Sequence, residues 1–591
     1  MINLKFTDTN FYYKKDKPIF TKLNLELKSN FISLVGPDGA GKSTLLKLIA
    51  KVLKPTSGTC IFENDAKKTT SIGYMSQRLG LYEELSVIDN LNFMCAVKDY
   101  DPKIHRQELL TLLNRVGLLK FKDYAVSALS GGMKQKLALC CTLATKPSCL
   151  ILDEPTVGVD PLSRQDIWQI IHEYLDNNEV FCIFSTAYLE EAQAADFCIF
   201  LQDGKIVNSA NPQELLQKLK DRTFILDSNY HYQKLLRLLL NRSSMLADPY
   251  LSDICPRAGK IDVLTKKQFT KDELIDHFKD IFLKNDCDVN FTLTARTPCL
   301  EDVYIALNEH SDDKNSVKIT NDDLKEASLV NANTASDEEI IKVQDIKKTF
   351  GSFTAVHKST FSVKKGEIFG LLGPNGAGKT TTFRMICALL NPSSGHISIN
   401  GIDLTKAKSV VREQIGYVSQ KFSLYRKMTL WQNLNYFAGS YGLFGVHKIK
   451  RLNFLLADFN LTAFKDVLAE DLPFGIQRQL SMACALIHEP KILFLDEATS
   501  GADPIARRVF WQRILELANI GTSVIVTTHF MEEAEYCDRF LIQDQGRILA
   551  LGKPDDICDV NGRRTSIEEA FIRKIIEFRK TQEGPHESSA S

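Results

Sequence analysis

The sequence lacks any uninterrupted apolar run close to the roughly 20 residues that a helix needs to cross a bilayer. Its first residues, Met1-Ile2-Asn3-Leu4-Lys5, also lack the charged, apolar and small-residue regions of a signal peptide. From the sequence we therefore expect a soluble chain, and any role at a membrane would have to run through partner subunits.

Excess charge of either sign is absent as well, because Lys+Arg and Asp+Glu both number 73. Nucleic-acid-binding proteins usually carry a basic excess, so no nucleic-acid partner is expected. The 14 cysteines show no paired metal-ligand spacing. Several lie inside apolar stretches (Cys149, Cys182, Cys387 and Cys484), as small buried residues of a reducing compartment do.

What the chain does contain is a long internal repeat. The stretch Gly36 to Thr44 (GPDGAGKST) returns as Gly373 to Thr381 (GPNGAGKTT). Further on, Ile72 to Gln77 returns as Ile415 to Gln420, and Leu150 to Glu154 as Leu493 to Glu497. Because the order and approximate spacing are kept, the repeat indicates duplicated domains rather than a short-period solenoid.

The repeat and the shifts in composition predict five segments. They are a first repeated domain (1–220), an α+β extension (221–308), a flexible polar linker (309–338), a second repeated domain (339–562), and a short helical extension with a disordered tail (563–591). Within the extension, Phe224 to Leu226 and Ile261 to Leu264 favour strands, while Tyr232 to Leu240 and Lys271 to Leu283 favour helices. In each repeated domain, short apolar runs alternate with helical patterns, which is typical of an α/β fold with a mostly parallel sheet.

Each glycine-rich stretch follows an apolar run and precedes a helical pattern, the context of a phosphate-binding loop. Glycines let backbone N–H groups surround a phosphate, and the helix N-terminus adds partial positive charge. Lys42 and Lys379 would neutralise the β- and γ-phosphates of ATP, and the hydroxyls of Ser43 and Thr380 would bind Mg²⁺. The predicted ATP-binding residues of the two loops are Gly36, Pro37, Asp38, Gly39, Ala40, Gly41, Lys42, Ser43, Thr44, Gly373, Pro374, Asn375, Gly376, Ala377, Gly378, Lys379, Thr380 and Thr381.

Two acidic residues end an apolar strand in each unit. Asp153 and Asp496 are predicted to hold Mg²⁺ through water, and the next residues, Glu154 and Glu497, to act as general bases toward the attacking water. The alternative is a pair of surface acids at a strand end, but the phosphate-binding loop predicted in each unit disfavours this interpretation.

The stretch Leu129 to Leu137 (LSGGMKQKL) resembles the signature sequence of ABC-type ATPases. The resemblance covers nearly the whole chain. It implies two tandem P-loop domains, each with a RecA-like parallel-sheet core, an antiparallel β subdomain and a helical signature subdomain. It also implies an intramolecular head-to-tail sandwich, in which ATP lies between one unit's loop and the other unit's signature.

The same resemblance assigns further residues. Gln77 and Gln420 match the catalytic glutamine loop, Asp160 and Asp503 match the D-loop, and His529 matches the switch histidine. Ser130, Gly131 and Gly132 of the signature would bind ATP from across the sandwich. Tyr13 and Phe350 lie where the family stacks an aromatic ring on adenine, although a half-buried strand aromatic is an equally good interpretation.

More narrowly, the chain is similar to tandem ATP-binding subunits of type-2 ABC exporters of the multidrug-efflux kind. Thr297 to Tyr304 (TPCLEDVY) resembles the hallmark of their C-terminal extension, and Ser566 to Phe571 a reduced second copy. The resemblance implies a peripheral protein on the cytoplasmic face of the inner membrane. Two multi-span permease subunits would dock near Gln77 and Gln420, unless those stretches are ordinary packed surface, and a periplasmic adaptor is compatible with such an assembly.

The two halves differ at the residues that matter most for hydrolysis. Pro473 and Phe474 replace the serine and first glycine of the second signature, and Ala187 replaces the switch histidine of the first half. Head-to-tail pairing would bring these losses into one pocket. We therefore expect one hydrolytic site, with Lys379, Glu497 and His529, and one weakly active site that keeps Glu154.

Three alternatives stay open at this stage. A tandem ABC ATPase acting on ribosomes or nucleic acid would usually keep both signatures and a long charged helical pair between its halves. A sugar-importer ATPase would lack the Glu301-Asp302-Val303-Tyr304 hallmark. A scaffold without activity is disfavoured by the intact second-half residues, and the transported substrate is not readable from this chain.

Overall fold

The computed structural model describes residues 2–14, 17–27, 29–64, 71–176, 180–228, 235, 239, 248–257, 259–284, 289–308, 338–404, 406–420, 423–499, 502–560 and 563–583. Nearly all of the predicted linker (309–338), most of the helical run expected at Tyr232 to Leu240 and the last eight residues of the predicted tail lie outside this set. No helix within the described ranges is long and apolar enough to cross a membrane.

The chain divides into two compact units. The first contains Met1–Lys220, Pro298–Leu307 and Gly501–Pro504, and the second contains Asp221–Thr297, Asn308–Ser500 and Ile505–Ser591. Each unit is built around its own six-stranded sheet.

The sheet of the first unit has the strand order β5-β6-β7-β3-β8-β9. Its strands are β5 (Ile72–Met75), β6 (Cys149–Asp153), β7 (Phe181–Ser185), β3 (Phe31–Val35), β8 (Phe197–Gln202) and β9 (Lys205–Ala210). All neighbours pair in parallel except β8 and β9. The central strands β6 and β7 are buried throughout, because helices or a second sheet cover both faces of a parallel sheet and favour continuous apolar runs.

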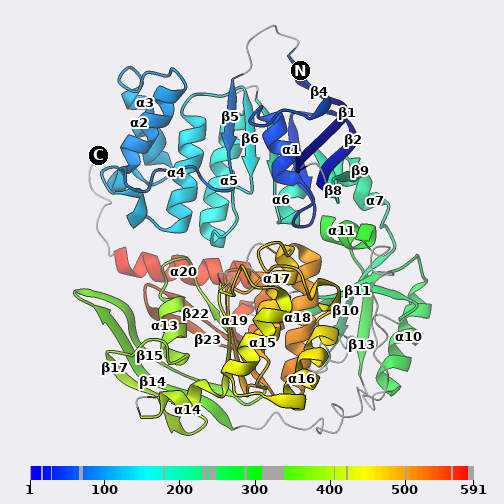
Figure 1. Ribbon diagram of the computed structural model, residues 1–591, viewed down its shortest axis with the longest axis vertical. Coiled ribbons are helices and arrows are strands. Elements are labelled where there is room, and N and C mark those ends of the chain that lie inside the picture. Colours follow the sequence, from blue (N-terminus) through cyan, green and yellow to red (C-terminus); the bar gives the residue numbers. More distant parts are fainter. Residues whose placement is uncertain are drawn as a thin grey trace. The chain divides into compact units, whose positions relative to one another are not determined.

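Different layers cover the two faces of this sheet (Figure 1). An antiparallel sheet of β2 (Lys17–Leu27), β1 (Ile2–Lys14) and β4 (Ser57–Asn64) shares one core with α1 (Lys42–Ile49), containing Phe6, Phe20 and Leu46. A second core, containing Leu91, Leu113 and Leu137, joins the helices α2 (Val87–Val97), α3 (Arg106–Arg115), α4 (Gly131–Leu143) and α5 (Pro161–Asp176). The smaller helices are α6 (Leu189–Gln193), α7 (Pro212–Gln217) and α11 (Leu300–Asn308).

The second unit repeats this plan with the order β19-β20-β21-β16-β22-β23. The strands are β19 (Ile415–Val418), β20 (Ile492–Asp496), β21 (Ser523–Thr528), β16 (Ile368–Leu372), β22 (Arg539–Asp544) and β23 (Arg547–Gly552). An antiparallel sheet of β15 (Phe353–Lys364), β14 (Glu339–Phe350), β17 (Ser394–Ile399) and β18 (Ile402–Asp403) lies over α13 (Lys379–Ile386). The predicted duplication and α/β class are thus confirmed at the level of strand order.

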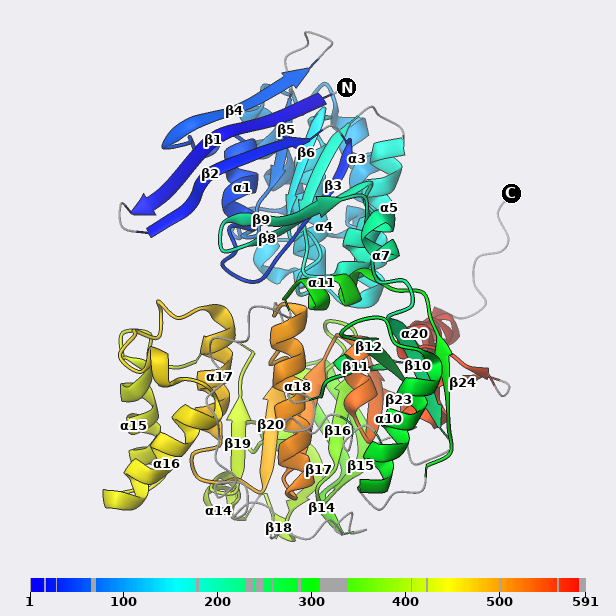
Figure 2. The same ribbon diagram turned by 90° about the vertical axis from the view of Figure 1, so that its right-hand side faces the viewer.

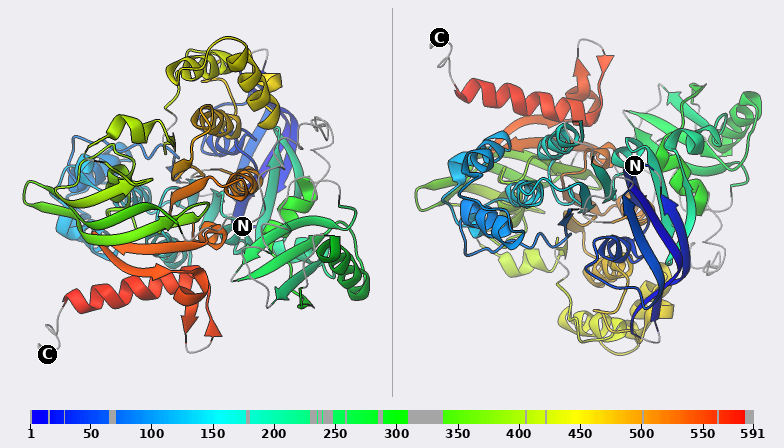
Figure 3. Two further views of the ribbon diagram at one scale, coloured as in Figure 1. Left: turned by 90° about the horizontal axis from the view of Figure 1, so that it is seen from below. Right: turned by 90° about the horizontal axis from the view of Figure 1, so that it is seen from above.

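The remaining helices of the second unit follow the order of those in the first, except that the helix between β18 and β19 has no counterpart among the described residues of the first unit. They are α14 (Lys408–Arg412), α15 (Leu430–Ser440), α16 (Gly445–Asp458), α17 (Phe474–Ala485), α18 (Pro504–Asn519), the 3₁₀ segment η5 (Met531–Tyr536) and α19 (Pro554–Cys558). A terminal helix, α20 (Ile567–Glu583), packs along β23 and η5 (Figure 3).

The extension after the first ATPase domain forms an antiparallel sheet of order β11-β12-β10-β13 with α10 (Lys271–Lys284) against it. Its strands are β11 (Leu251–Arg257), β12 (Lys260–Thr265), β10 (Thr223–Ser228) and β13 (Phe291–Ala295). The strand and helix predictions at Phe224, Ile261 and Lys271 are confirmed. Although this sheet follows the first domain in the chain, its buried hydrophobic residues form one core with those of the second ATPase domain (Figure 2).

Polar contacts join the extension to the second domain as well. Asp253 of β11 forms an ion pair with Arg508 of α18, with both side chains mostly buried. The backbone N–H of Gly259 donates to Glu535 Oε2 of η5 at 3.3 Å. By contrast, α11 belongs to the first unit, where the N–H of Leu300 donates to Gln193 Oε1 at 3.0 Å. The stretch 221–308 thus divides between the two units after Thr297.

Candidate active sites

The two phosphate loops adopt the same backbone conformation. Gly39 and Gly41 have φ values of 82° and 106°, and Gly376 and Gly378 have 83° and 93°. These values lie in the left-handed region that favours glycine. Gly41 and Gly378 precede the first residues of α1 and α13, and no side chain caps either helix. The first N–H groups of each helix are therefore left for another acceptor, as in an anion site.

Each loop is packed on one side and open on the other. A Cβ at Gly36 would lie 2.0 Å from the carbonyl oxygen of Leu201, and one at Gly373 would lie 2.2 Å from that of Gln543. A Cβ at Gly39 or Gly376 would meet nothing within 4 Å. Each loop is thus packed against the sheet at its first glycine and has open space beside the glycine three residues later.

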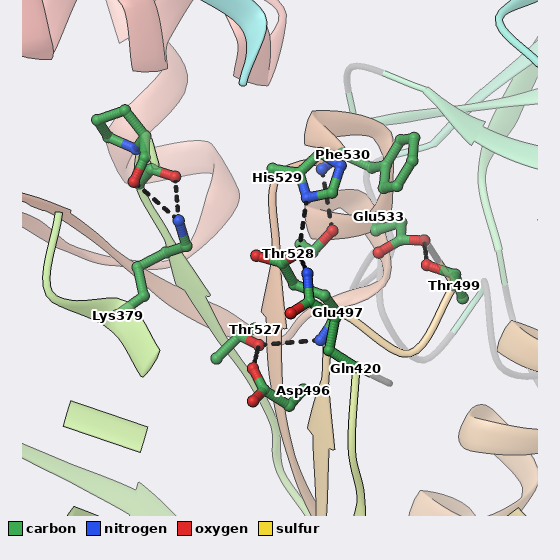
Figure 4. Close-up of polar contacts among 12 residues, drawn as sticks. Lys379, Gln420, Asp496, Glu497, Thr499, Thr527, Thr528, His529, Phe530 and Glu533 are labelled. Carbon is green, nitrogen blue, oxygen red and sulfur yellow. Dashed lines mark hydrogen bonds and ion pairs between the residues drawn. The ribbon is translucent and has the colours of Figure 1, made fainter. Parts of the chain in front are cut away.

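In each loop, a buried lysine side chain donates hydrogen bonds to the backbone carbonyls of the first two loop residues. Lys42 Nζ donates to the carbonyls of Gly36 and Pro37 at 2.6 and 3.2 Å. Lys379 Nζ donates to Gly373 and Pro374 at 2.6 and 2.9 Å (Figure 4). An ammonium group has three donors, and the two contacts of Lys42 with these carbonyls use two of them.

The residues expected to hold Mg²⁺ meet beside the first loop. Ser43 Oγ donates to Asp153 Oδ1 at 3.0 Å, and Asp153 Oδ2 is buried without a hydrogen-bond partner among the described residues. An orphaned carboxylate oxygen next to a hydroxyl fits a magnesium ion that keeps its waters. In the second half Asp496 lies at the same place, and Thr380 at the start of α13 is exposed. Among the described residues, no group of three or more His, Cys, Asp and Glu side chains is arranged to hold a metal ion.

The predicted general bases lie just beyond these aspartates, in a strained turn. Glu154 and Glu497 have φ values of 52° and 45°, which are uncommon for a residue with a side chain. Their N–H groups donate to the hydroxyls of Ser185 and Thr527, each at 3.0 Å. A positive φ at a residue with a side chain costs about 1–3 kcal/mol, and such residues cluster at functional sites.

The same two hydroxyls also bind the aspartates. Ser185 Oγ donates to Asp153 Oδ1 at 2.8 Å, and Thr527 Oγ1 to Asp496 Oδ1 at 2.7 Å. One hydroxyl on the neighbouring strand therefore fixes both the aspartate and the glutamate. The sequence analysis missed Ser185 and Thr527, although their place two residues before Ala187 and His529 at a strand end was a usable signal.

The structure brings the predicted glutamines to the bases. Gln77 Nε2 donates to Glu154 Oε2 at 2.7 Å, and Gln420 Nε2 to Glu497 Oε2 at 2.6 Å. In both halves, the glutamine in the loop after β5 or β19 thus donates a hydrogen bond to the carboxylate that would polarise the attacking water.

The two pockets differ at the switch position. His529 Nδ1 lies 3.4 Å from Glu497 Oε2 (Figure 4), and His529 Nε2 is buried without a hydrogen-bond partner in the described part of the chain. A buried ring nitrogen with no partner fits an interaction with a bound phosphate. Ala187 occupies this position in the first half and offers no polar side-chain atom.

This difference changes the electrostatics of the two bases. Burial raises the pKa of Glu154, and Lys42 only partly opposes it. Burial also raises the pKa of Glu497, but His529, Lys379 and Gln420 outweigh that effect and leave the pKa below its usual value. Glu497 is therefore the more securely ionised base at neutral pH.

The first loop carries an acid, Asp38, at one of its predicted ATP-binding positions. Asp38 occupies the position of Asn375, and burial raises its pKa to about 6 despite the nearby Lys42. A carboxyl group in a phosphate loop adds negative charge where phosphate would bind, which is a further difference between the pockets.

The two signature helices begin differently. Ser130 caps α4, its Oγ accepting the N–H of Met133 at 3.3 Å, whereas Pro473 precedes α17 with no side-chain cap. A Cβ at Gly131 would meet nothing within 4 Å, but one at Gly132 would lie 3.2 Å from Ser163 Oγ. Packing inside the domain thus explains why a side chain is disfavoured at Gly132, but it does not explain the glycine at position 131. The absence of a side chain at Gly131 needs another reason, such as close approach of a ligand.

The two candidate adenine-stacking residues are largely exposed. Tyr13 is 58% exposed, and its hydroxyl lies 3.4 Å from Thr44 Oγ1 at the start of α1. Phe350 is 50% exposed at the end of β14, with Lys348 Nζ 5.2 Å from its ring centre. Both rings leave a face available, and their role in binding adenine stays a prediction.

Two parallel sheets with uncapped glycine loops, a buried lysine, and an aspartate–glutamate pair at a neighbouring strand end define a tandem P-loop ATPase. The family model of the ABC transporter matches residues 20–157 and 356–500. A probable multidrug ABC transporter ATP-binding protein of Escherichia coli (strain K12), YbhF, is 38% identical over 578 residues, which cover 96% of each chain. The chain belongs to the family of ABC transporter ATP-binding proteins, and the predicted resemblance is confirmed.

Other relatives match a single half of the chain. The linearmycin resistance ATP-binding protein LnrL of Bacillus subtilis (strain 168) is 39% identical over 244 residues, covering 40% of this chain and 78% of LnrL. A Nod factor export ATP-binding protein I of Cupriavidus metallidurans is 38% identical over 221 residues, covering 37% of this chain and 73% of that protein.

Proposed function

We propose that the chain hydrolyses ATP to drive export of drugs or other small molecules through separate membrane subunits, at the cytoplasmic face of the inner membrane. The near full-length similarity to a probable multidrug ABC transporter ATP-binding protein supports this function. The names of two further relatives, one concerned with linearmycin resistance and one with Nod factor export, also point to export.

The proposal includes unequal pockets. With head-to-tail pairing, Lys379, Glu497 and His529 would work with the intact signature at Ser130 and form the hydrolytic site. The first loop would face Pro473, which has neither a hydroxyl nor an N–H to offer. The observation that carries this assignment is the contrast between His529 beside Glu497 and Ala187 beside Glu154.

In the hydrolytic pocket each side chain would have a separate task. Lys379 and the loop N–H groups would hold the phosphates, while Thr380 and Asp496 would hold Mg²⁺, which supplies charge neutralisation there. Glu497 would accept the proton of the attacking water, with Gln420 orienting its carboxylate through the 2.6 Å contact. His529 would donate to the γ-phosphate and keep Glu497 ionised.

Steady-state ATPase measurements on two variants of the full chain test the assignment. Glu497→Gln should nearly abolish turnover, because the amide cannot accept the proton. Glu154→Gln should leave a large share of it. The matched substitutions remove the same group from equivalent places, so the reverse ranking would reject the unequal pockets.

Matching surfaces after the two glutamines support docking of the permease subunits. The rings of Tyr82 and Phe93 lie 4.9 Å apart, and those of Tyr425 and Tyr436 lie 4.8 Å apart. Tyr82 and Tyr425 are about half exposed, so each pair offers an apolar contact to a partner.

An asparagine of the following helix fixes the backbone under each pair. Asn90 Oδ1 accepts the N–H of Tyr82, as Asn433 Oδ1 does that of Tyr425. Tyr82→Ala and Tyr425→Ala should therefore reduce co-purification with the membrane subunits while leaving the ATPase domains folded. Unchanged co-purification of the double variant would exclude these surfaces.

A further inference from the structure

A buried carboxylate lies one turn beyond each switch position, in contact with the loop that follows the general base. In the second half this residue is Glu533, which is 2% exposed. Its Oε1 accepts a hydrogen bond from Thr499 Oγ1, which is 4% exposed and comes two residues after Glu497 (Figure 4). This contact joins the loop after the base to η5, between residues that are 34 positions apart in the sequence.

The switch turn itself is held from two sides. Phe530 N–H donates to Thr528 Oγ1 at 2.9 Å, which closes the turn around His529. The guanidinium carbon of Arg507, in α18, lies 4.3 Å from the centre of the Phe530 ring, and Arg507 Nε lies 3.9 Å from Glu533 Oε1. Arg507 therefore contacts both the ring that follows the histidine and the carboxylate that holds the base loop.

The first half repeats this arrangement. Glu191 Oε1 accepts from Thr156 Oγ1 at 2.7 Å and its Oε2 from Thr186 Oγ1 at 2.5 Å, while Tyr188 N–H donates to Thr186 Oγ1 at 2.9 Å. Arg164 lies 4.6 Å from the centre of the Tyr188 ring. The cluster thus exists with or without a histidine at the switch position, so the histidine does not create it.

We propose that Glu533, Thr499 and Arg507 are positioning residues that hold His529 at a fixed separation from Glu497 during hydrolysis. The proposal rests on the proposed function, because the expected effect on turnover requires a hydrolytic pocket that contains the switch histidine. A base and a phosphate donor on separate loops must keep their distance within a fraction of an ångström for efficient catalysis. Glu533 contacts both Thr499, in the loop after the base, and Arg507, which lies against the Phe530 ring after the histidine.

A hydroxyl-specific pair of substitutions tests this role. Thr499→Val keeps the shape of the side chain and removes its hydrogen bond, whereas Thr499→Ser keeps the hydroxyl. We expect Thr499→Val to lower kcat about tenfold or more, with the KM for ATP nearly unchanged, and Thr499→Ser to restore most of the turnover. A loss that appeared mainly in KM, or an equal loss in both variants, would overturn the positioning role.

The duplicated cluster supplies the matched comparison. Thr156→Val removes the equivalent hydrogen bond to Glu191 from the pocket without the histidine, and its effect on kcat should be much smaller. Both variants lose a similar buried hydrogen bond, so the thermal melting of each is measured to check that it folds. If Thr499→Val melts early, Glu533→Gln and Glu191→Gln provide the same comparison. Equal losses of kcat in the two halves would reject the proposal.

The result can be separated from the larger assignment. If Glu497→Gln keeps most of the turnover, the assignment of one hydrolytic and one weakly active pocket is wrong. If Glu497→Gln abolishes turnover but Thr499→Val and Glu533→Gln leave kcat unchanged, only the positioning role is wrong.

Discussion

Replacement of His529 by alanine should make the second pocket resemble the first. The substitution removes an imidazole that is 3% exposed, that lies 3.4 Å from the base, and whose Nε2 has no protein partner among the described residues. If Nε2 donates to the γ-phosphate in the transition state, one charged hydrogen bond is lost. Such a bond contributes about 1.5–3 kcal/mol, which corresponds to a fall in turnover of about 10- to 150-fold.

The same substitution should also change the pH dependence of turnover. Burial raises the pKa of Glu497, and His529, Lys379 and Gln420 together lower it below the usual value. Without His529, one of the groups that lower the pKa of Glu497 is lost while the raising effect of burial remains, so this pKa should rise. The base must be ionised to accept a proton, and the acid limb of the profile should therefore move to higher pH.

Steady-state ATPase assays across a pH series measure both effects in one experiment. Ala187→His in the first half is the reciprocal control, and it should not raise turnover because Pro473 still lacks the signature hydroxyl. A fall of less than about threefold in His529→Ala, with an unmoved acid limb, would refute the catalytic role of the histidine.

Two further substitutions test the packing that supports the pockets. Gly36→Ala places a Cβ 2.0 Å from the carbonyl oxygen of Leu201 and should displace the first loop, which fluorescent-nucleotide titration would detect as weaker binding, while Gly439→Ala, whose nearest neighbour would be 3.6 Å away, should bind normally. Asp253→Ala removes the ion pair between the extension and the buried Arg508 and should lower the midpoint of thermal or urea unfolding of the second unit, so an unchanged midpoint would contradict the docking of the extension.

The phosphate sites were predictable because the sequence itself encodes their local geometry. Glycines with positive φ, a lysine at the helix start and an acid at the end of an apolar strand each depend on neighbours in the chain. The strand order also repeats between the units, so a duplicated motif predicted a duplicated sheet. Such short-range signals can be recognised in the sequence without knowledge of tertiary contacts.

Contacts between distant segments were not predictable in the same way. Nothing in the sequence near Asp253 indicates that its partner is Arg508, or that the extension shares its core with the second ATPase domain instead of the first. Thr499 and Glu533 likewise read as ordinary loop and helix residues until the fold places them together. Hydrophobic burial is non-directional, so an apolar pattern predicts that a face is covered but does not name the covering element.

The cluster around Glu191 bears on how the first pocket should be understood. A pocket that had simply lost its function would have no reason to keep a buried carboxylate, which is costly without partners. Yet Glu191 retains two hydroxyl donors, and Tyr188 retains its contact with Arg164, beside a position that carries only Ala187. The loops around Glu154 thus keep the tie that the second pocket has, while Ala187 stands in place of the switch histidine. This combination supports a first pocket that binds nucleotide in a defined geometry and turns it over slowly, rather than a collapsed site.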